Sequence, residues 1–223
     1  MGYDIDLYKI SIDGYKKILQ TTHLIPNWKV LKENIDYLNT IKKHGICNLK
    51  ELQQRLKKKD HLLDFSRQSG LSEQYLNVLR RMINGYLRKP NRIKDFPETS
   101  ADVVLKLEKI GIKHTRHLFD KIVTLDGRAL FSKQVNISDE EILRLTKLTD
   151  LSRIRWVNHT FAYVLYEAGF DTVKKVANAN PNQLYKKITA LNAERKFYPA
   201  HIGLNDMKML VECAEMLPPD IEY

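Results

Sequence analysis

The sequence predicts an all-α protein built from repeated pairs of short helices. Three stretches of equal length share one pattern, and they begin at Asn34, Ser100 and Asn158. Each stretch opens with a small polar residue, continues to a glycine, and then enters a second periodic run. Repetition of this kind indicates stacked copies of one helical unit. We find no stretch with the alternation of apolar and polar residues that is typical of a strand.

The helix that precedes each glycine is the best-defined part of the repeat. Apolar residues stand four and seven positions before the glycine, a spacing that makes one apolar stripe on a helix. The polar residue that opens each copy is a good N-cap. The glycine itself is expected in the left-handed conformation that ends many helices. The three glycines are Gly45, Gly111 and Gly169.

A second helix is expected to follow each glycine, and a further block repeats after the first two copies. The block FSRQSGLSEQYLNVLRRM matches FSKQVNISDEEILRLTKL, and Ser72 and Ser138 are their predicted N-caps. Residues 34–82 and 100–148 are therefore interpreted as two copies of a larger unit. The second helices of the three pairs are expected to begin near Asn48, His114 and Asp171.

The domain organisation follows from the prolines and the charge. Prolines fall between the predicted helices, and the stretch from Leu87 to Pro97 is the best candidate boundary. We therefore predict a basic N-terminal helical domain over residues 1–92, which contains the first helix pair. A second domain over residues 93–223 contains the second and third pairs and a C-terminal helix.

Composition and charge restrict the class of protein. The chain has 223 residues, 43% hydrophobic and 29% charged, as expected of a soluble globular protein. No apolar run is long enough to span a bilayer and no secretory signal is visible, so we expect a cytoplasmic protein without a membrane partner. Residues 1–92 carry 18 Lys and Arg against 9 Asp and Glu, whereas residues 93–223 carry 19 against 18. This asymmetry favours a polyanionic partner for the first part.

The third copy resembles a helix–hairpin–helix unit. It reads DLSRIRWVNHTFAYVLYEAGFDTVKKVANANPNQLYKKI, and the residues that fit the motif are Ala162, Leu165, Ala168, Gly169, Phe170, Thr172 and Val173. The wider arrangement, which closes with LNAERKFYPAHIGLNDMKMLVECAEML, resembles the domain-of-unknown-function family 4332 over about residues 93–217. Residues 34–92 look like an extra copy of its first half. The resemblance implies tandem helix–hairpin–helix-like repeats and raises the expectation of sequence-nonspecific binding to DNA backbone.

The hairpins themselves depart from the motif. Helix–hairpin–helix units use two glycines to bring main-chain N–H groups close to a phosphate. Those glycine positions are held by Lys32 and Asn34, by Glu98 and Ser100, and by Trp156 and Asn158. Glu98 places a carboxylate where the phosphate should lie, and Trp156 fills the approach with an indole ring. Only Lys32 is electrostatically favourable.

Nucleic acid, if it binds, is expected on the basic first part of the chain. Arg80, Arg81 and Arg88 should flank the outer face of a helix whose other side is buried. The alternative is an ordinary solvated helix surface. The candidate nucleic-acid-binding residues are Lys32, Lys57, Lys58, Lys59, Arg80, Arg81, Arg88, Lys89 and Arg92.

A protein partner is the second possibility. Trp156 at a hairpin tip is either packed under the turn or an anchor for a partner. In that case the chain is an interaction scaffold whose hairpins no longer bind phosphate.

The sequence carries no catalytic signature. We find no phosphate-binding glycine motif and no group typical of a nucleophilic triad, so we expect no enzyme activity and no cofactor. His114 and His117 form an H-x-x-H pair without a second ligand pair nearby, and no metal is expected. Cys47 and Cys213 are both expected to be small buried residues.

Overall fold

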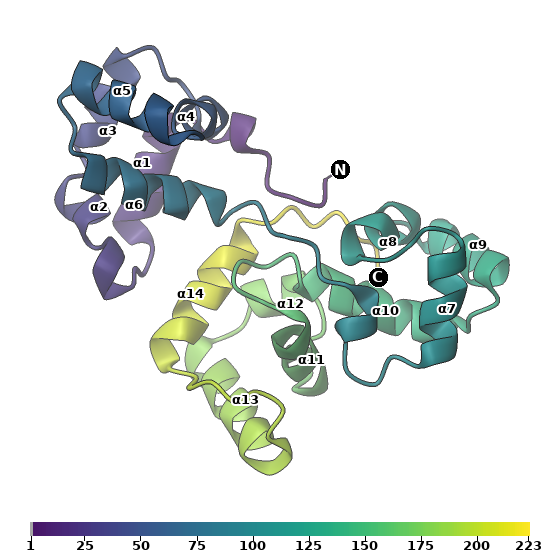
Figure 1. Ribbon diagram of the computed structural model, residues 1–223. Coiled ribbons are helices and arrows are strands. Elements are labelled where there is room, and N and C mark those ends of the chain that lie inside the picture. The colour runs from purple at the N-terminus through teal and green to yellow at the C-terminus, as the bar shows by residue number, and fades with distance from the viewer. Residues whose placement is uncertain (1) are drawn as a thin grey trace. The chain divides into compact units, whose positions relative to one another are not determined.

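The computed structural model describes residues 2–223, and their regular structure is helical (Figure 1). Over these residues, pairing of the β type is limited to two isolated bridges, Ser11 with Asn48 and Arg92 with His114. The prediction of an all-α protein is confirmed. The chain divides into two compact units, Ile5–Leu87 and a second unit made of residues 2–4 and 88–223.

The Ile5–Leu87 unit is organised around its last helix. Helix α6 packs against α2, α4 and α5, and α1 packs against α3. Fully buried side chains between them include Tyr15, Leu38, Ile41, Leu52 and Leu79. The elements are η1 (Leu7–Lys9), α1 (Ile12–Thr21), η2 (Pro26–Trp28), α2 (Val30–Glu33), α3 (Tyr37–Lys43), α4 (Leu49–Arg55), α5 (Lys59–Ser69) and α6 (Glu73–Asn84).

The second unit is organised around α10. This helix packs against α8, α9 and α11, while α14 packs against α12 and α13. Its amphipathic neighbours bury an apolar cluster that includes Leu107, Leu118, Ile122, Phe131 and Leu145. The elements are η3 (Ile93–Asp95), α7 (Ala101–Lys109), α8 (Thr115–Ile122), α9 (Leu125–Val135), α10 (Asp139–Leu151), α11 (His159–Glu167), α12 (Val173–Ala177), α13 (Pro181–Arg195) and α14 (Leu204–Glu215).

The glycines that align the three copies have the predicted backbone conformation. Gly45, Gly111 and Gly169 have φ values of 80°, 82° and 84°. No heavy atom would lie within 4 Å of a Cβ added at any of them. The glycines are therefore required for the left-handed turn itself rather than for a close approach of other atoms.

Most of the predicted N-caps are confirmed by side-chain hydrogen bonds. Ser100 accepts from the N–H of Val103, and Asn158 accepts from the N–H of Phe161. Ser72 and Ser138 cap α6 and α10 in the same way. Such bonds satisfy N–H groups that have no partner within the helix.

The predicted cap at Asn34 is wrong. Asn34 is the C-cap of α2, and its side-chain amide donates to the carbonyl of Val30 at 3.0 Å. Helix α3 begins only at Tyr37, after Asp36. The short helix α2 therefore contains Lys32, the first of the two positions at which the first hairpin was expected, and it ends at Asn34, the second.

The prediction of two buried cysteines is half correct. Cys213 on α14 is buried, whereas Cys47 is exposed in the turn between α3 and α4. The turn at Gly45 buries Ile46 instead, and the next side chain points to solvent.

Candidate nucleic-acid interface and buried polar network

Three consecutive lysines form the most exposed cationic group of the Ile5–Leu87 unit. Lys57, Lys58 and Lys59 occupy the turn from α4 to α5, and all three side chains are exposed. Lys58 is the N-cap of α5 and makes no side-chain cap bond. Because these side chains are exposed, their ammonium groups are accessible to an anionic partner.

Other candidates of this unit lie on helices that pack together. Arg81 on α6 is exposed, whereas Arg80 is half-buried and donates to Asn77 Oδ1 at 2.9 Å. Lys32 is half-buried on α2, which packs against α6. Because α4 and α5 also pack against α6, these residues and the lysine run belong to one packed group of helices.

The remaining candidates belong to the second unit, which corrects the prediction of one cluster on one helix. Helix α6 ends at Asn84, before Arg88, Lys89 and Arg92. The guanidinium of Arg88 donates to the carbonyl of Val157 at 3.0 Å, and burial lowers its pKa. Arg88 therefore does not flank an outer helix face, since its side chain supports the third hairpin. Lys89 and Arg92 are both exposed, near the start of this unit.

Two hairpins place a non-glycine residue in a conformation that favours glycine. Glu98 has φ 58° and Trp156 has φ 68°, and these are the positions at which the sequence comparison predicted the first glycine of a helix–hairpin–helix motif. A left-handed conformation costs such a residue about 1–2 kcal/mol, so its surroundings must impose it.

Arg144 on α10 holds the backbone of the second hairpin. Its guanidinium donates to the carbonyls of Pro97 and Glu98 at 3.3 and 3.4 Å and to Thr99 Oγ1 at 3.0 Å. Arg144 also makes two bonds with Glu141, which lies one turn earlier. The second hairpin is thus held by a cation of the protein itself and presents the carboxylate of Glu98, which is unsuited to a phosphate.

The third hairpin presents an aromatic ring. Trp156 is 40% exposed, so its ring is neither completely buried beneath the turn nor fully free in solvent. The guanidinium carbon of Arg155 lies 4.3 Å from the centroid of the indole ring. This geometry leaves part of a large apolar surface accessible at the tip of the hairpin.

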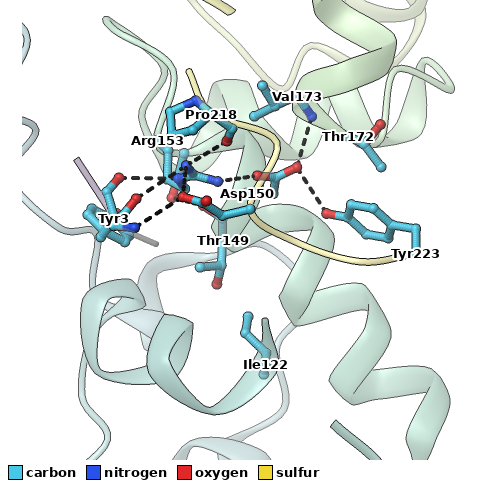
Figure 2. Close-up of polar contacts among 12 residues, drawn as sticks. Tyr3, Ile122, Thr149, Asp150, Arg153, Thr172, Val173, Pro218 and Tyr223 are labelled. Atoms are coloured by element: carbon cyan, nitrogen blue, oxygen red, sulfur yellow. Dashed lines mark hydrogen bonds and ion pairs between the residues drawn. The ribbon is translucent and has the colours of Figure 1, made fainter. Parts of the chain in front are cut away.

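A buried ion pair that sequence reasoning missed lies at the end of α10 (Figure 2). Arg153 Nη1 donates to Asp150 Oδ1 at 2.8 Å, and both side chains are almost completely buried. The same guanidinium donates to the carbonyls of Gly2, Tyr3 and Pro218. One arginine therefore connects α10 with two segments that are more than sixty residues away on either side.

Asp150 has a role in the repeat that its sequence position does not reveal. In the first two copies, the N–H of Leu49 donates to Ile10 and the N–H of Thr115 donates to Asn91, in each case to a main-chain carbonyl. In the third copy, the equivalent N–H of Val173 donates to Asp150 Oδ2 at 3.0 Å. A carboxylate has replaced a carbonyl. The DLSRI stretch is visible as a motif in the sequence, but only the fold brings its acid to α12.

The surroundings of Asp150 determine its ionisation. Burial raises the pKa of this carboxyl, although Arg153, the N–H of Val173 and the hydroxyl of Tyr223 favour its charged form. These partners occupy the carboxylate oxygens and thereby favour the charged pair.

Asp171 shows the opposite behaviour. Its carboxylate lies 2.6 Å from the ammonium groups of both Lys147 and Lys175. Burial alone would raise the pKa of Asp171, but the hydrogen bonds and charges of the two lysines together lower it below the ordinary 3.8.

The lowered pKa of Asp171 predicts a pH-dependent contribution to stability. A group whose folded pKa is depressed stabilises the protein above its unfolded pKa, and this contribution is lost as the pH falls through the folded value. We expect Asp171→Asn to lower the free energy of unfolding at about pH 7, and its difference from the wild type to vanish near about pH 2. Urea titrations across this range measure the difference. A difference that stays constant over the whole range would contradict the assignment.

His114, which is half-buried, and His117, which is exposed, form a close pair of rings inclined at 34°. The rings of His114 and His117 lie 3.6 Å apart between centroids. Burial, and then the neighbouring His117 and Arg116, lower the pKa of His114. Across residues 2–223, no three His, Cys, Asp or Glu side chains gather in a way that could hold a metal ion.

These observations define an all-α protein that is assembled from short capped helices. The chain belongs to the family described as Domain of unknown function (DUF4332), whose model matches residues 97–217. Comparisons with curated proteins and with solved structures find no match. In the part of the chain that the structure describes, none of the helices is both long and apolar enough to cross a bilayer.

Proposed function

We propose that this chain is a non-catalytic protein whose Ile5–Leu87 unit binds the backbone of nucleic acid without reading its sequence. The observation that carries the proposal is the excess of cations over acids in this unit. Residues 5–87 contain 15 Lys and Arg against 8 Asp and Glu. Four of these acids already pair with cations of the same unit, namely Asp6, Asp13, Asp36 and Asp64.

The uncompensated charge is concentrated in the turn that contains Lys57, Lys58 and Lys59. Exposed ammonium groups attract phosphates and release their counterions, which supplies most of the affinity in nonspecific binding. Arg81 and Lys32, on helices packed in the same group, extend the cationic surface. DNA is the partner that the helix–hairpin–helix resemblance favours.

We also infer that the repeated pairs are helix–hairpin–helix-like. The support is the left-handed conformation of Glu98 and Trp156 at the first glycine position of the motif, followed by the capping residues Ser100 and Asn158. The residues at these two hairpins do not suit a phosphate. The proposal therefore assigns the phosphate contacts to the lysine turn instead.

The first test of the proposal is the salt dependence of binding. We expect the full chain to bind duplex DNA, with an affinity whose logarithm falls linearly with the logarithm of the salt concentration. A surface that contacts three to five phosphates should give a slope of about −3 to −5. Fluorescence anisotropy with labelled duplex DNA, single-stranded DNA and RNA between about 50 and 200 mM salt measures it. Absence of binding to all three probes at the lowest salt would refute the proposal.

A protein-interaction scaffold is the second candidate function, and the exposed ring of Trp156 favours it. Aromatic residues at the centre of an interface often carry much of the binding energy. The third hairpin places this ring on a rigid turn, since Arg88 donates to Val157 and Asn158 caps α11.

Trp156→Gly tests whether the ring serves the fold or an interface. Glycine at φ 68° relieves about 1 kcal/mol of backbone strain. This gain offsets part of the packing energy that is lost when the half-exposed ring is removed. We expect the free energy of unfolding, followed by far-ultraviolet circular dichroism, to change by less than about 1 kcal/mol. A decrease of about 3 kcal/mol or more would show that the ring is structural.

A further inference from the structure

The segment from Pro218 to Tyr223 contacts the rest of the second unit in the manner of a bound peptide. It has no regular secondary structure. The N–H of Glu222 donates to the carbonyl of Val123 at 2.9 Å, and Arg153 Nη2 donates to the carbonyl of Pro218 at 3.2 Å. These bonds join the segment to Val123, which directly follows α8, and to Arg153, which follows α10. Figure 2 shows the bond between Arg153 and Pro218.

An apolar anchor lies between these bonds. The side chain of Ile221 is 8% exposed and packs with Tyr3 and Phe119, with Val123 against them. The Tyr3 and Phe119 rings meet edge to face, with centroids 5.6 Å apart. This cluster is separate from the larger core around α10. Ile221 thus packs against walls that are largely aromatic.

Each polar side chain of the segment has its own partner. Asp220 Oδ2 accepts from the N–H of Gly2 at 3.1 Å and lies 3.7 Å from Arg153. Glu222 Oε2 accepts at 3.2 Å from the N–H of Leu125, the first residue of α9.

The last described residue completes this set of contacts. The hydroxyl of Tyr223 donates to Asp150 Oδ2 at 3.0 Å (Figure 2). The guanidinium carbon of Arg128 lies 5.8 Å from the centroid of the Tyr223 ring. The pattern recognised is therefore an acid, an aliphatic side chain, a second acid and a tyrosine. Arg153 and Arg128 complement the charge of the two acids.

Most residues of the docking surface lie within the family match, but the segment that occupies the surface does not. Phe119, Val123, Arg128, Asp150 and Arg153 lie within the matched residues 97–217, whereas Gly2, Tyr3 and the segment 218–223 lie outside them. We propose that this surface, formed mostly by the family domain and completed by Gly2 and Tyr3, is a peptide-docking site, and that in this chain residues 218–223 occupy it as an exchangeable ligand. A peptide that carries the same pattern is the partner that fits it.

Exchange requires only that the contacts of residues 218–223 break. One aliphatic side chain and a few hydrogen bonds hold this segment, so it can open locally without unfolding the helices beneath it. As a tethered ligand, it competes with free peptide at an effective concentration of about a millimolar.

A labelled peptide tests the proposal on the full chain. The peptide LPPDIEY, which copies residues 217–223 and carries fluorescein, is titrated with wild type and with Ile221→Asp, whose own segment no longer fills the site. If the peptide binds with a Kd of about 10 μM, the tethered segment should make it bind the wild type about 100-fold more weakly than the variant. The same peptide with Asp in place of Ile is the control, and it should bind neither protein.

Two results of this titration would overturn the proposal. One is no binding of the peptide to an Ile221→Asp variant that retains the circular dichroism spectrum of the wild type. The other is equal binding to both proteins, since that would mean that the resident segment does not occupy the site.

Hydrogen exchange on the wild type provides a test that does not depend on the variant folding. The N–H of Glu222 should exchange through local opening, at least about 100-fold faster than the central amides of α10. Equal protection at both places would show that the segment opens only when the whole unit unfolds, and the proposal would fail.

Discussion

Replacing Arg153 by leucine is expected to lower the free energy of unfolding of the second unit by about 3–5 kcal/mol at neutral pH. The guanidinium is fully buried and supplies the counter-charge of Asp150 together with bonds to three main-chain carbonyls. Leucine leaves the carboxylate buried without its counter-charge, and it leaves those carbonyls without a donor.

The two tryptophans make this measurement possible in one unit at a time. Trp28 lies in the Ile5–Leu87 unit and Trp156 in the other. In a Trp28→Phe background, the fluorescence of Trp156 therefore reports the urea unfolding of the unit that contains Arg153.

The matched control is a pair of the same type and spacing at the surface. Asp64 and Arg67 are also three residues apart and lie 2.6 Å from each other, but their side chains are 51% and 77% exposed. Arg67→Leu, followed through Trp28 in a Trp156→Phe background, should cost less than about 1 kcal/mol. An Arg153→Leu variant that is destabilised no more than this control would contradict the structural role of the buried pair.

The pH dependence gives a second readout of the Arg153 variant. Removal of the counter-charge raises the pKa of the buried Asp150 further, so that the carboxyl takes up a proton more readily. The destabilisation by Arg153→Leu should therefore diminish as the pH falls below neutrality. A variant that merely disturbed packing would show no such recovery.

Reversing the charge of Lys57, Lys58 and Lys59 to glutamate is expected to have the largest effect on nucleic-acid binding. If each lysine neutralises one phosphate, the salt slope should become less steep by about 3. At about 0.1 M salt, this corresponds to a decrease in affinity of about 100-fold to 1,000-fold. The same anisotropy titrations measure both quantities.

A control with the same change in charge separates a local surface from the net charge of the molecule. Lys133 on α9, Lys174 on α12 and Lys186 on α13 are exposed residues of the second unit. Their joint replacement by glutamate alters the net charge by the same amount. We expect this control to weaken binding much less than the Lys57–Lys59 variant does. Equal effects would show that the lysine turn is not the binding surface.

The parts of the fold that were predicted from sequence depend on chemistry within a few residues. Gly45, Gly111 and Gly169 end helices because glycine adopts the left-handed conformation at little cost. This preference can be predicted without knowledge of the rest of the chain. Ser100 and Asn158 cap helices through N–H groups three residues ahead, so their role was also predictable.

The first hairpin shows how local preferences can compete. Asn34 has the side chain of a good N-cap, yet α2 continues up to it and makes it a C-cap. The caps at Ser100 and Asn158 follow residues in the left-handed conformation, Glu98 and Trp156, whereas Lys32 is helical. The three positions look alike in the sequence, because the repeat pattern does not reveal whether the residue there adopts a left-handed or a helical backbone conformation.

The amino-acid pattern was sufficient to predict the all-α class, the ends and caps of most helices, the family, and the concentration of cations in the first part of the chain. The folded structure was needed to show that Arg88 supports a hairpin, that Asp150 and Arg153 form a buried pair, and that residues 218–223 pack beside them. The physical reason is that helix caps and turns are satisfied by near neighbours in the chain. The cost of a buried charge is instead offset by partners from distant segments, and their proximity exists only after the helices have packed.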